Sequence, residues 1–360
     1  MELIYLPMAD IYLSLPLLLA IGLGGGIISS MLGIGGGIII TPSLMSIGIP
    51  SGVAISTQLN NSVGTNFSGF LAYQQERDVD ISLAWYLFVG GLAGALAEKF
   101  ALHLVEAKAG SYAVLKIIVF LVLIVSSVVT FIQSQRPTRA RTEKGAMMRR
   151  WMIYFPWHKI FLRSRVEMSI LVPIGVGFFT GTVTTSLGGG NSLLMAPILM
   201  YLLGRSSPVV SGTSLLAGFG INIVVTFIAS VGQAPVDFVL LPILVVSSVI
   251  GSIIGARLAY KFSPKVLKVI GAFVLMAIAS KMYFELKLVN WQTTSNGKNF
   301  FNKFPMILKK IQAMPDQNWM LPIAQYAHDS PMEYTIITLT SVSVFVGILQ
   351  FLINRIVWRS

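Results

Sequence analysis

Two glycine clusters are the features of this chain whose residue types and spacing could support chemistry. The first, Gly35-Gly36-Gly37, is followed by Pro42, and the second, Gly188-Gly189-Gly190, is followed by Pro197. Three adjacent glycines weaken a helix, and proline cannot continue the helical hydrogen-bond ladder. Each cluster therefore predicts a helix that breaks and starts again. The free N–H groups and positive dipole end of the restarted helix favour an anion.

Polar side chains on the neighbouring apolar segments could complete such a site. Polar groups at membrane depth must find partners, so we expect them to face the bundle interior. The predicted substrate-binding residues are Gly35, Gly36, Gly37, Thr57, Gln58, Gly188, Gly189, Gly190, Asn191, Ser192, Thr213 and Ser214. Further polar residues of the same kind are Ser56, Asn60, Asn61, Thr65, Asn66, Asn222 and Thr226. Two other interpretations stay open: the glycines can serve only close helix packing, and the polar side chains can serve only to tie helices together.

The sequence lacks the residues that a metal site or an enzyme active site would require. The chain has no cysteine, and its histidines, His103, His158 and His328, are scattered along the sequence. No nucleophile–base pair or metal-ligand spacing can be assembled from them. The sequence therefore predicts no metal, no cofactor and no enzymatic activity, and a membrane-embedded enzyme is a disfavoured alternative.

The composition indicates an integral membrane protein. Of 360 residues, 54% are hydrophobic and 11% are charged, with a mean hydropathy of +0.77, whereas soluble domains carry about 25% charged residues. The apolar segments lie at 13–33, 36–49, 52–72, 82–104, 113–133, 168–186, 190–204, 207–230, 236–260, 265–286 and 335–357. A membrane-spanning helix needs about 20 apolar residues. The predicted fold class is thus an all-α integral membrane protein, a polytopic bundle of about 9–11 transmembrane segments.

Matching residues at matching spacing indicate two related halves. Thr57, Gly64, Asn66, Asp80 and Gly94 recur in the same order as Thr213, Gly220, Asn222, Asp237 and Gly251. Each aspartate precedes a long apolar segment, where it is predicted to cap the helix. The predicted domains are a first membrane repeat at 1–133, a basic loop at 134–167, a second repeat at 168–286, a polar loop at 287–334 and an extra C-terminal transmembrane helix at 335–360.

The distribution of positive charge predicts the orientation. Much of the net charge of +12 falls between Arg136 and Arg165, so the positive-inside rule places loop 134–167 in the cytoplasm of a multi-pass protein in the cell (inner) membrane. This explains the charge without nucleic-acid binding. If 36–49 and 190–204 cross the membrane, each half crosses an odd number of times and the repeats are inverted. The alternative is that both segments re-enter.

The pattern resembles the TauE/SafE sulfite-exporter-like permeases over roughly residues 15–286. The resemblance rests on Gly33-Ile34-Gly35-Gly36-Gly37-Ile38-Ile39-Ile40-Thr41-Pro42, on Gly212-Thr213-Ser214-Leu215 and on the run 250–259. It implies a duplicated, multi-pass permease for small sulfur-containing or organic anions, including sulfite and sulfoacetate. The second cluster departs from the first, with two more residues between its glycines and Pro197. Its helix start is therefore expected to be displaced, with Asn191 or Ser192 supplying contacts.

These observations lead to one functional hypothesis. The chain is expected to transport a small, sulfur-containing anion by alternating access at a midplane site between the repeats, with the lipid bilayer as its other partner. An inside-negative potential favours anion export by about 2.3 kcal/mol per charge per 100 mV. The alternative is a membrane scaffold or sensor that binds a partner through 287–334 and the last helix, which lie outside the family pattern.

Overall fold

The computed structural model describes residues 3–105, 156–164, 166–182, 207–231 and 236–262, together with single positions at 124, 127, 128, 131, 195, 196, 198 and 199 and between 266 and 280. Several predicted features lie largely or wholly outside these residues: the apolar segment at 113–133, most of the basic loop, the loop at 287–334 and the last helix. The predicted site residues Gly188, Gly189, Gly190, Asn191 and Ser192 also lie outside them.

The described part is a helical bundle with a short hairpin before the first helix of each half. The helices are α1 (Leu15–Leu32), α2 (Gly37–Ser46), α3 (Ser51–Gln75), α4 (Ile81–Val105), α7 (Leu171–Gly181), α9 (Ser207–Val231) and α10 (Leu240–Lys261). The strands are β1 (Leu3–Leu6), β2 (Ile11–Ser14), β3 (His158–Phe161) and β4 (Val166–Ser169), paired as two antiparallel hairpins. Seven predicted apolar segments coincide with these helices, which confirms that part of the prediction.

The polarity of the bundle is that of a membrane protein. Four of the described helices are long and apolar enough to cross a membrane, at Leu15–Leu32, Ile81–Glu98, Pro208–Ala229 and Leu240–Lys261. Large apolar side chains such as Trp85 and Phe100 are exposed on their outer faces, whereas polar side chains of α3 such as Asn61 are buried. This reversal of the soluble pattern confirms the polytopic membrane class.

Two buried clusters show the directions of the helices. One cluster joins Leu18 and Val53, near the starts of α1 and α3, to Leu44 at the end of α2 and Leu240 at the start of α10. The other joins residues at the ends of α1, α3 and α10, including Leu32, Tyr73 and Ala259. Helices α1, α3 and α10 therefore run in the same direction, and α2 returns the chain to the end where α1 began.

Helices α3 and α9, which the sequence predicts to be equivalent, run in opposite directions. Gly212 of α9 lies against Tyr73 of α3, and Phe219 stacks on Phe67 with ring centroids 4.8 Å apart. Helix α9 thus runs antiparallel to α3. In the same way, α1 packs in parallel against α10, and α7 packs in parallel against α4, so each half supplies one helix to each pair.

Glycines allow the backbones of these parallel pairs to touch. A Cβ atom at Gly177 or Gly181 of α7 would overlap backbone atoms of Leu87 or Gly91 in α4. A Cβ atom at Gly251 or Gly255 of α10 would overlap backbone carbonyls of α1. Small residues at such positions are the common basis of close packing between membrane helices.

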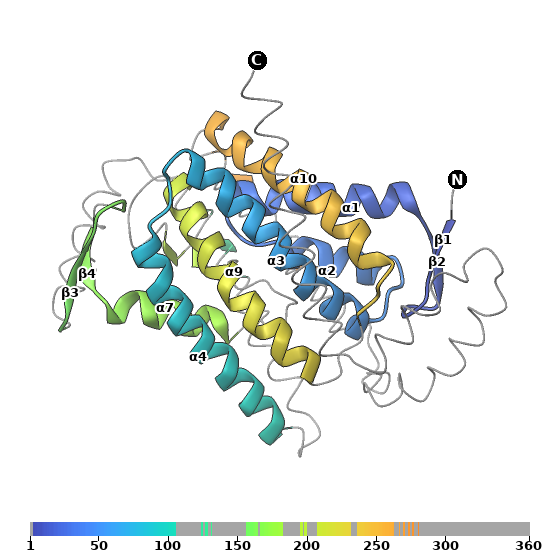
Figure 1. The fold of residues 1–360 in the computed structure, drawn as a ribbon, viewed down its shortest axis with the longest axis horizontal. Helices are drawn as coiled ribbons and strands as arrows, with labels where there is room; N and C mark the ends of the chain where they lie inside the picture. The colour runs from blue at the N-terminus through green and yellow to red at the C-terminus, as the bar shows by residue number, and fades with distance from the viewer. Residues whose placement is uncertain are drawn as a thin grey trace.

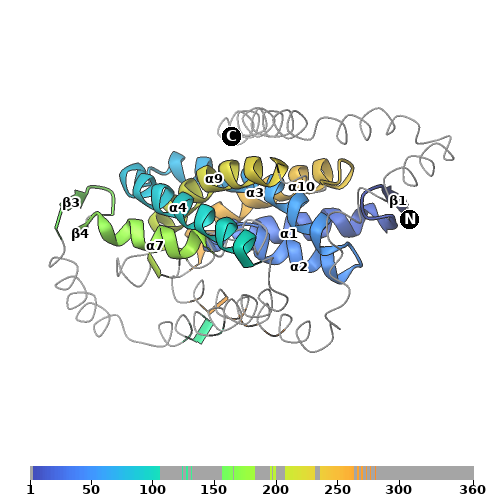
Figure 2. The ribbon, with the colours of Figure 1, turned by 90° about the horizontal axis from the view of Figure 1, so that it is seen from below.

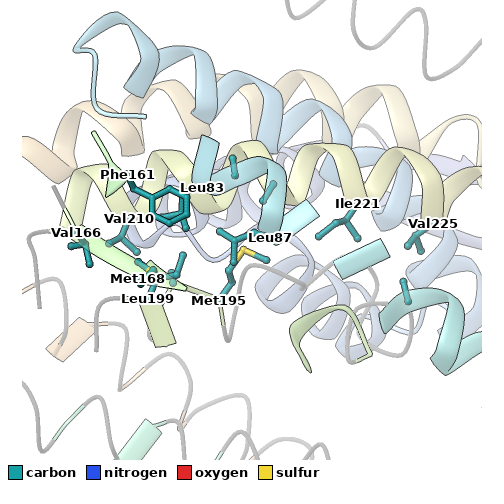
Figure 3. Close-up of a cluster of buried hydrophobic side chains, with 14 of the residues drawn as sticks. Leu83, Leu87, Phe161, Val166, Met168, Met195, Leu199, Val210, Ile221 and Val225 are labelled. Carbon is teal, nitrogen blue, oxygen red and sulfur yellow. The ribbon is translucent and has the colours of Figure 1, made fainter. Parts of the chain in front are cut away.

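The two hairpins are elements that the predicted all-α class did not include. Figure 1 shows them at opposite ends of the molecule, and the view from below in Figure 2 agrees. The β3–β4 hairpin is held by Phe161, Val166 and Met168, which pack with Leu83 and Leu87 of α4 (Figure 3). Each strand has only four residues, too short a stretch for alternation of polar and apolar residues to stand out.

Candidate functional site

The first glycine cluster breaks the helix, as the sequence predicts. Helix α1 ends at Leu32, and Gly33 adopts the left-handed conformation with φ +69°. Its N–H group and that of Ile34 bond back to the carbonyls of Ser30 and Ser29, a closure typical of helix C-termini. Gly35 has φ +71°, and α2 begins at Gly37. Both positive φ values favour glycine because a Cβ atom is strained there.

The restarted helix begins in the interior of the bundle. A Cβ atom at Gly36 would lie 3.1 Å from Nε2 of Gln58 and 3.6 Å from a methyl group of Thr65, both near the middle of α3. The N-cap residue of α2 is Gly36, which has no side chain, and no side-chain cap bond is found for α2 among the described residues. The first N–H groups of α2 therefore lack the partners that an N-cap normally supplies.

Gln58 belongs to a hydrogen-bond network beside this helix start. Its Nε2 donates to Ser62 Oγ at 3.1 Å, and its Oε1 accepts from Asn61 Nδ2 at 3.0 Å. Ser248 of α10 donates to Asn61 Oδ1 at 2.8 Å. All four side chains are buried, so the network fixes the orientation of the Gln58 amide next to Gly36.

Thr57 and Thr213 do not lie at the helix break, although the sequence groups them with it. Thr57 Oγ1 accepts a hydrogen bond from the backbone N–H of Asp237, and Thr213 Oγ1 accepts one from Asp80, each at 3.0 Å. Each threonine thus forms a hydrogen bond to the start of a long helix in the opposite half. This is the alternative in which polar side chains tie helices together.

Ser214 also makes a bond between the halves. Its hydroxyl donates to the carbonyl of Gly33 at 2.8 Å and lies 3.0 Å from the carbonyl of Ser211. It therefore holds the turn that leads into α2. Of the described predicted residues, the structure brings together Gly35, Gly36, Gly37 and Gln58, while Ser214 supports their loop.

Asp80 and Asp237 are the centres of two equivalent networks. Asp80 caps α4 by accepting from the N–H of Leu83 at 3.1 Å, and Asp237 caps α10 by accepting from Leu240 at 2.9 Å. These bonds confirm the predicted caps. The second carboxylate oxygen of each aspartate accepts from a hairpin, through Ser164 for Asp80 and through the N–H of Met8 for Asp237. The hairpin contacts were missed, because the backbone N–H donors of Ser164 and Met8 leave no signal in the sequence.

A basic cavity of about 540 Å³ lies where the β3–β4 hairpin meets the turn between α3 and α4. Its lining includes Arg77, Lys159 and Arg163, together with Asp80 and Gln75. Lys159 Nζ donates to the Tyr86 hydroxyl at 3.4 Å and lies 5.1 Å from the centre of that ring. The cavity gives this end of the described bundle a positive face.

Comparison with known proteins gives a family match over most of the chain. A model of the family "Sulfite exporter TauE/SafE" matches residues 18–282. The probable membrane transporter protein YjnA of Bacillus subtilis (strain 168) is 24% identical over 266 residues, covering 74% of this chain and 98% of that protein. The probable membrane transporter protein YunE of the same strain is 24% identical over 283 residues, covering 76% and 98%. No solved structure matches.

Proposed function

The chain belongs to the TauE/SafE sulfite exporter family of membrane transporters, and from this premise we propose that it exports small sulfur-containing oxyanions such as sulfite or sulfoacetate. The observation that carries the proposal is the start of α2. The first N–H groups of α2, from Gly37 onward, have no partner within the helix, and Gly36 lies beside the Gln58 amide in a buried region of the bundle. Such a helix end attracts an anion without placing a full positive charge at membrane depth.

The proposed substrate contacts are the backbone of Gly36 and Gly37 and the amide of Gln58. Thr57, Thr213 and Ser214 hold the framework around these contacts through the bonds that join the halves. Gly188, Gly189, Gly190, Asn191 and Ser192 are proposed as the equivalent contacts of the second half, on sequence grounds.

Alternating access between inverted repeats is the proposed mechanism. The opposite directions of α3 and α9, which the sequence predicts to be equivalent, support it. When two similar halves are oppositely oriented, exchanging their conformations exposes a central site first to one face and then to the other. The interior position of the α2 start is suited to a site near the midplane.

The distribution of charge supports an orientation in which the β3–β4 end is cytoplasmic. Arg77, Lys159 and Arg163 line the basic cavity at this end, and Arg257 and Lys261 lie near the end of α10 in the same direction. The described residues of the β1–β2 hairpin contain no lysine or arginine. The positive-inside rule then assigns the basic end to the cytoplasm. There the cavity would concentrate anions before export.

We expect the purified protein in liposomes to accelerate sulfite movement, and an inside-negative potential to favour efflux. The potential contributes about 2.3 kcal/mol per charge per 100 mV to anion exit. Flux of sulfite, thiosulfate and sulfoacetate would be measured with and without an imposed potential, and protein-free liposomes would give the background. If none of the three anions moves faster than in protein-free liposomes, the proposed substrate class is wrong.

The chain has no cysteine, which makes single-cysteine labelling a direct test of orientation. Leu3 in β1 is 62% exposed and Leu162 in the β3–β4 turn is 83% exposed. A membrane-impermeant maleimide is expected to label Leu3→Cys in intact cells, and to label Leu162→Cys only after the membrane is permeabilised. The cysteine-free parent is the control. Labelling of both variants from outside would contradict placement of the hairpins on opposite faces.

A further inference from the structure

Two buried asparagine amides have no hydrogen-bond partner among the described residues. Asn66 in α3 and Asn222 in α9 are each 0% exposed, and both the Nδ2 and Oδ1 atoms of each are unpaired. The two residues occupy equivalent positions in the two halves. Nearly all buried polar groups in proteins are paired, and an unpaired amide destabilises the fold. Two buried amides without hydrogen-bond partners, at equivalent positions of the two halves, therefore require an explanation.

Both amides lie close to the point where α3 and α9 cross. Phe67 of α3 stacks on Phe219 of α9. Asn66 directly precedes Phe67, and Asn222 follows Phe219 by three residues. Both asparagines therefore lie within one helical turn of the stacked rings. The crossing is where the two halves meet, so it is the place where a ligand could contact both of them.

Asn222 lies level with the start of α2. Residues that are seven apart share a helix face, and Leu215, seven residues before Asn222, packs with Leu32 and Ile34 in the segment that leads to α2. The antiparallel register of α3 and α9 continues to place Asn222 near Val63. That position on α3 falls between Gln58 and Thr65, the two residues that flank Gly36. Asn222 thus lies at the depth of the α2 N-terminus, on the face of α9 that Leu215 turns toward the segment leading into α2.

Asn66 has the equivalent environment in the other half. Leu59, seven residues earlier on the same face of α3, packs with Met195 and Leu199. These two residues follow the second glycine cluster in sequence. The helix face that carries Asn222 therefore packs against the segment that leads into the first glycine cluster. The helix face that carries Asn66 packs against the segment that follows the second glycine cluster.

We propose that Asn66 and Asn222 bind the transported oxyanion, with each Nδ2 donating to an oxygen of the ligand. This assignment rests on the proposed function and extends it to residues at the crossing of α3 and α9. Neutral amide donors supply hydrogen bonds without the strong attraction of a buried lysine or arginine. A transport site must bind its ion weakly enough to release it, and neutral donors from both halves meet that requirement.

The assignment predicts that binding and stability change in opposite directions. Replacing an unpaired amide with an apolar side chain removes a destabilising group, so Asn66→Leu and Asn222→Leu are expected to unfold at the same temperature as the wild type or higher. The same variants lose a hydrogen bond to a charged ligand, which predicts a rise of about 10- to 100-fold in the Kd for sulfite. Asn66→Ala and Asn222→Ala repeat the test without added volume.

The experiment uses the full-length protein in detergent, with sulfite as the probe for calorimetric titration and thermal unfolding. Asn61→Leu is the matched control for stability, because Asn61 lies on the same helix but is paired with Gln58 and Ser248. It is expected to unfold at a lower temperature than the wild type. Weaker sulfite binding without loss of stability in the Asn66 and Asn222 variants would support the assignment.

Two results would overturn the assignment and leave the proposed function standing. One is sulfite binding within twofold of the wild type in all four variants. The other is a loss of stability as large as that of Asn61→Leu, with sulfite binding reduced only in proportion to the folded fraction, which would make the amides structural. If the wild type itself neither binds sulfite nor moves sulfite, thiosulfate or sulfoacetate, the proposed function fails and the assignment fails with it.

Discussion

Replacing Gly177 by alanine is expected to separate α7 from α4 and to destabilise the protein severely. A Cβ atom at this position would overlap the backbone carbonyl of Leu87. Backbone atoms of a packed helix cannot rotate away as a side chain can, so the two helices must move apart. Overpacking of a core costs about 1–3 kcal/mol and occasionally more, and a backbone contact belongs at the upper end. Gly26→Ala, which meets the backbone of Ser248, is expected to do the same to α1 and α10.

Each of these helices offers a matched control two residues away. Gly175 in α7 and Gly24 in α1 have no atom of the described residues within 4 Å of an added Cβ. Alanine favours a helix over glycine by about 1 kcal/mol, so Gly175→Ala and Gly24→Ala are expected to be neutral or stabilising. Thermal unfolding and the monodisperse fraction in size-exclusion chromatography would measure the difference. Equal stability of Gly177→Ala and Gly175→Ala would contradict the close backbone packing.

The contrast between these glycines shows what the sequence could predict. The long apolar segments were sufficient to locate α1, α3, α4, α9 and α10. A chain that crosses a membrane must pair its backbone N–H and C=O groups within the segment, so a long apolar segment forms a helix. Glycine was more ambiguous. Gly33 and Gly35 break the helix with positive φ values, whereas Gly177 and Gly251 lie inside helices and allow close packing. Three consecutive glycines followed by proline distinguished the first case from the second.

The candidate site was harder to predict than the helices. Gln58 and Thr57 are adjacent in sequence, yet Gln58 lies beside Gly36 while Thr57 bonds to the N–H of Asp237. Adjacent helical residues point about 100° apart, and the sequence alone does not show which direction leads to the glycine loop. The partner of Thr57 is a backbone group some 180 residues away. Such a donor exists at every residue except proline, so no residue type identifies it.

Asp80→Ala is expected to loosen one end of the bundle, and Asp237→Ala the other. The Asp80 carboxylate accepts from the N–H of Leu83 and from both the N–H and hydroxyl of Ser164, at 2.9–3.1 Å. The Asp237 carboxylate accepts from the N–H groups of Met8, Val239 and Leu240, at 2.9–3.0 Å. Either change leaves three buried donors unpaired. At about 1–3 kcal/mol for each, the expected loss is roughly 3–9 kcal/mol in the free energy of unfolding.

The effects of the two aspartate substitutions on stability can be distinguished from each other and from the effect of losing a charge. Glu76→Ala, at an exposed position, is expected to change the free energy of unfolding by at most about 0.5 kcal/mol. Ser164→Ala removes one bond to Asp80 and none to Asp237, so its effect should shrink in an Asp80→Ala background and persist in an Asp237→Ala background. Denaturant unfolding of the single and double variants in detergent would give these couplings. Asp80→Ala as stable as Glu76→Ala would contradict the network, because a carboxylate buried among three donors cannot be removed without consequence.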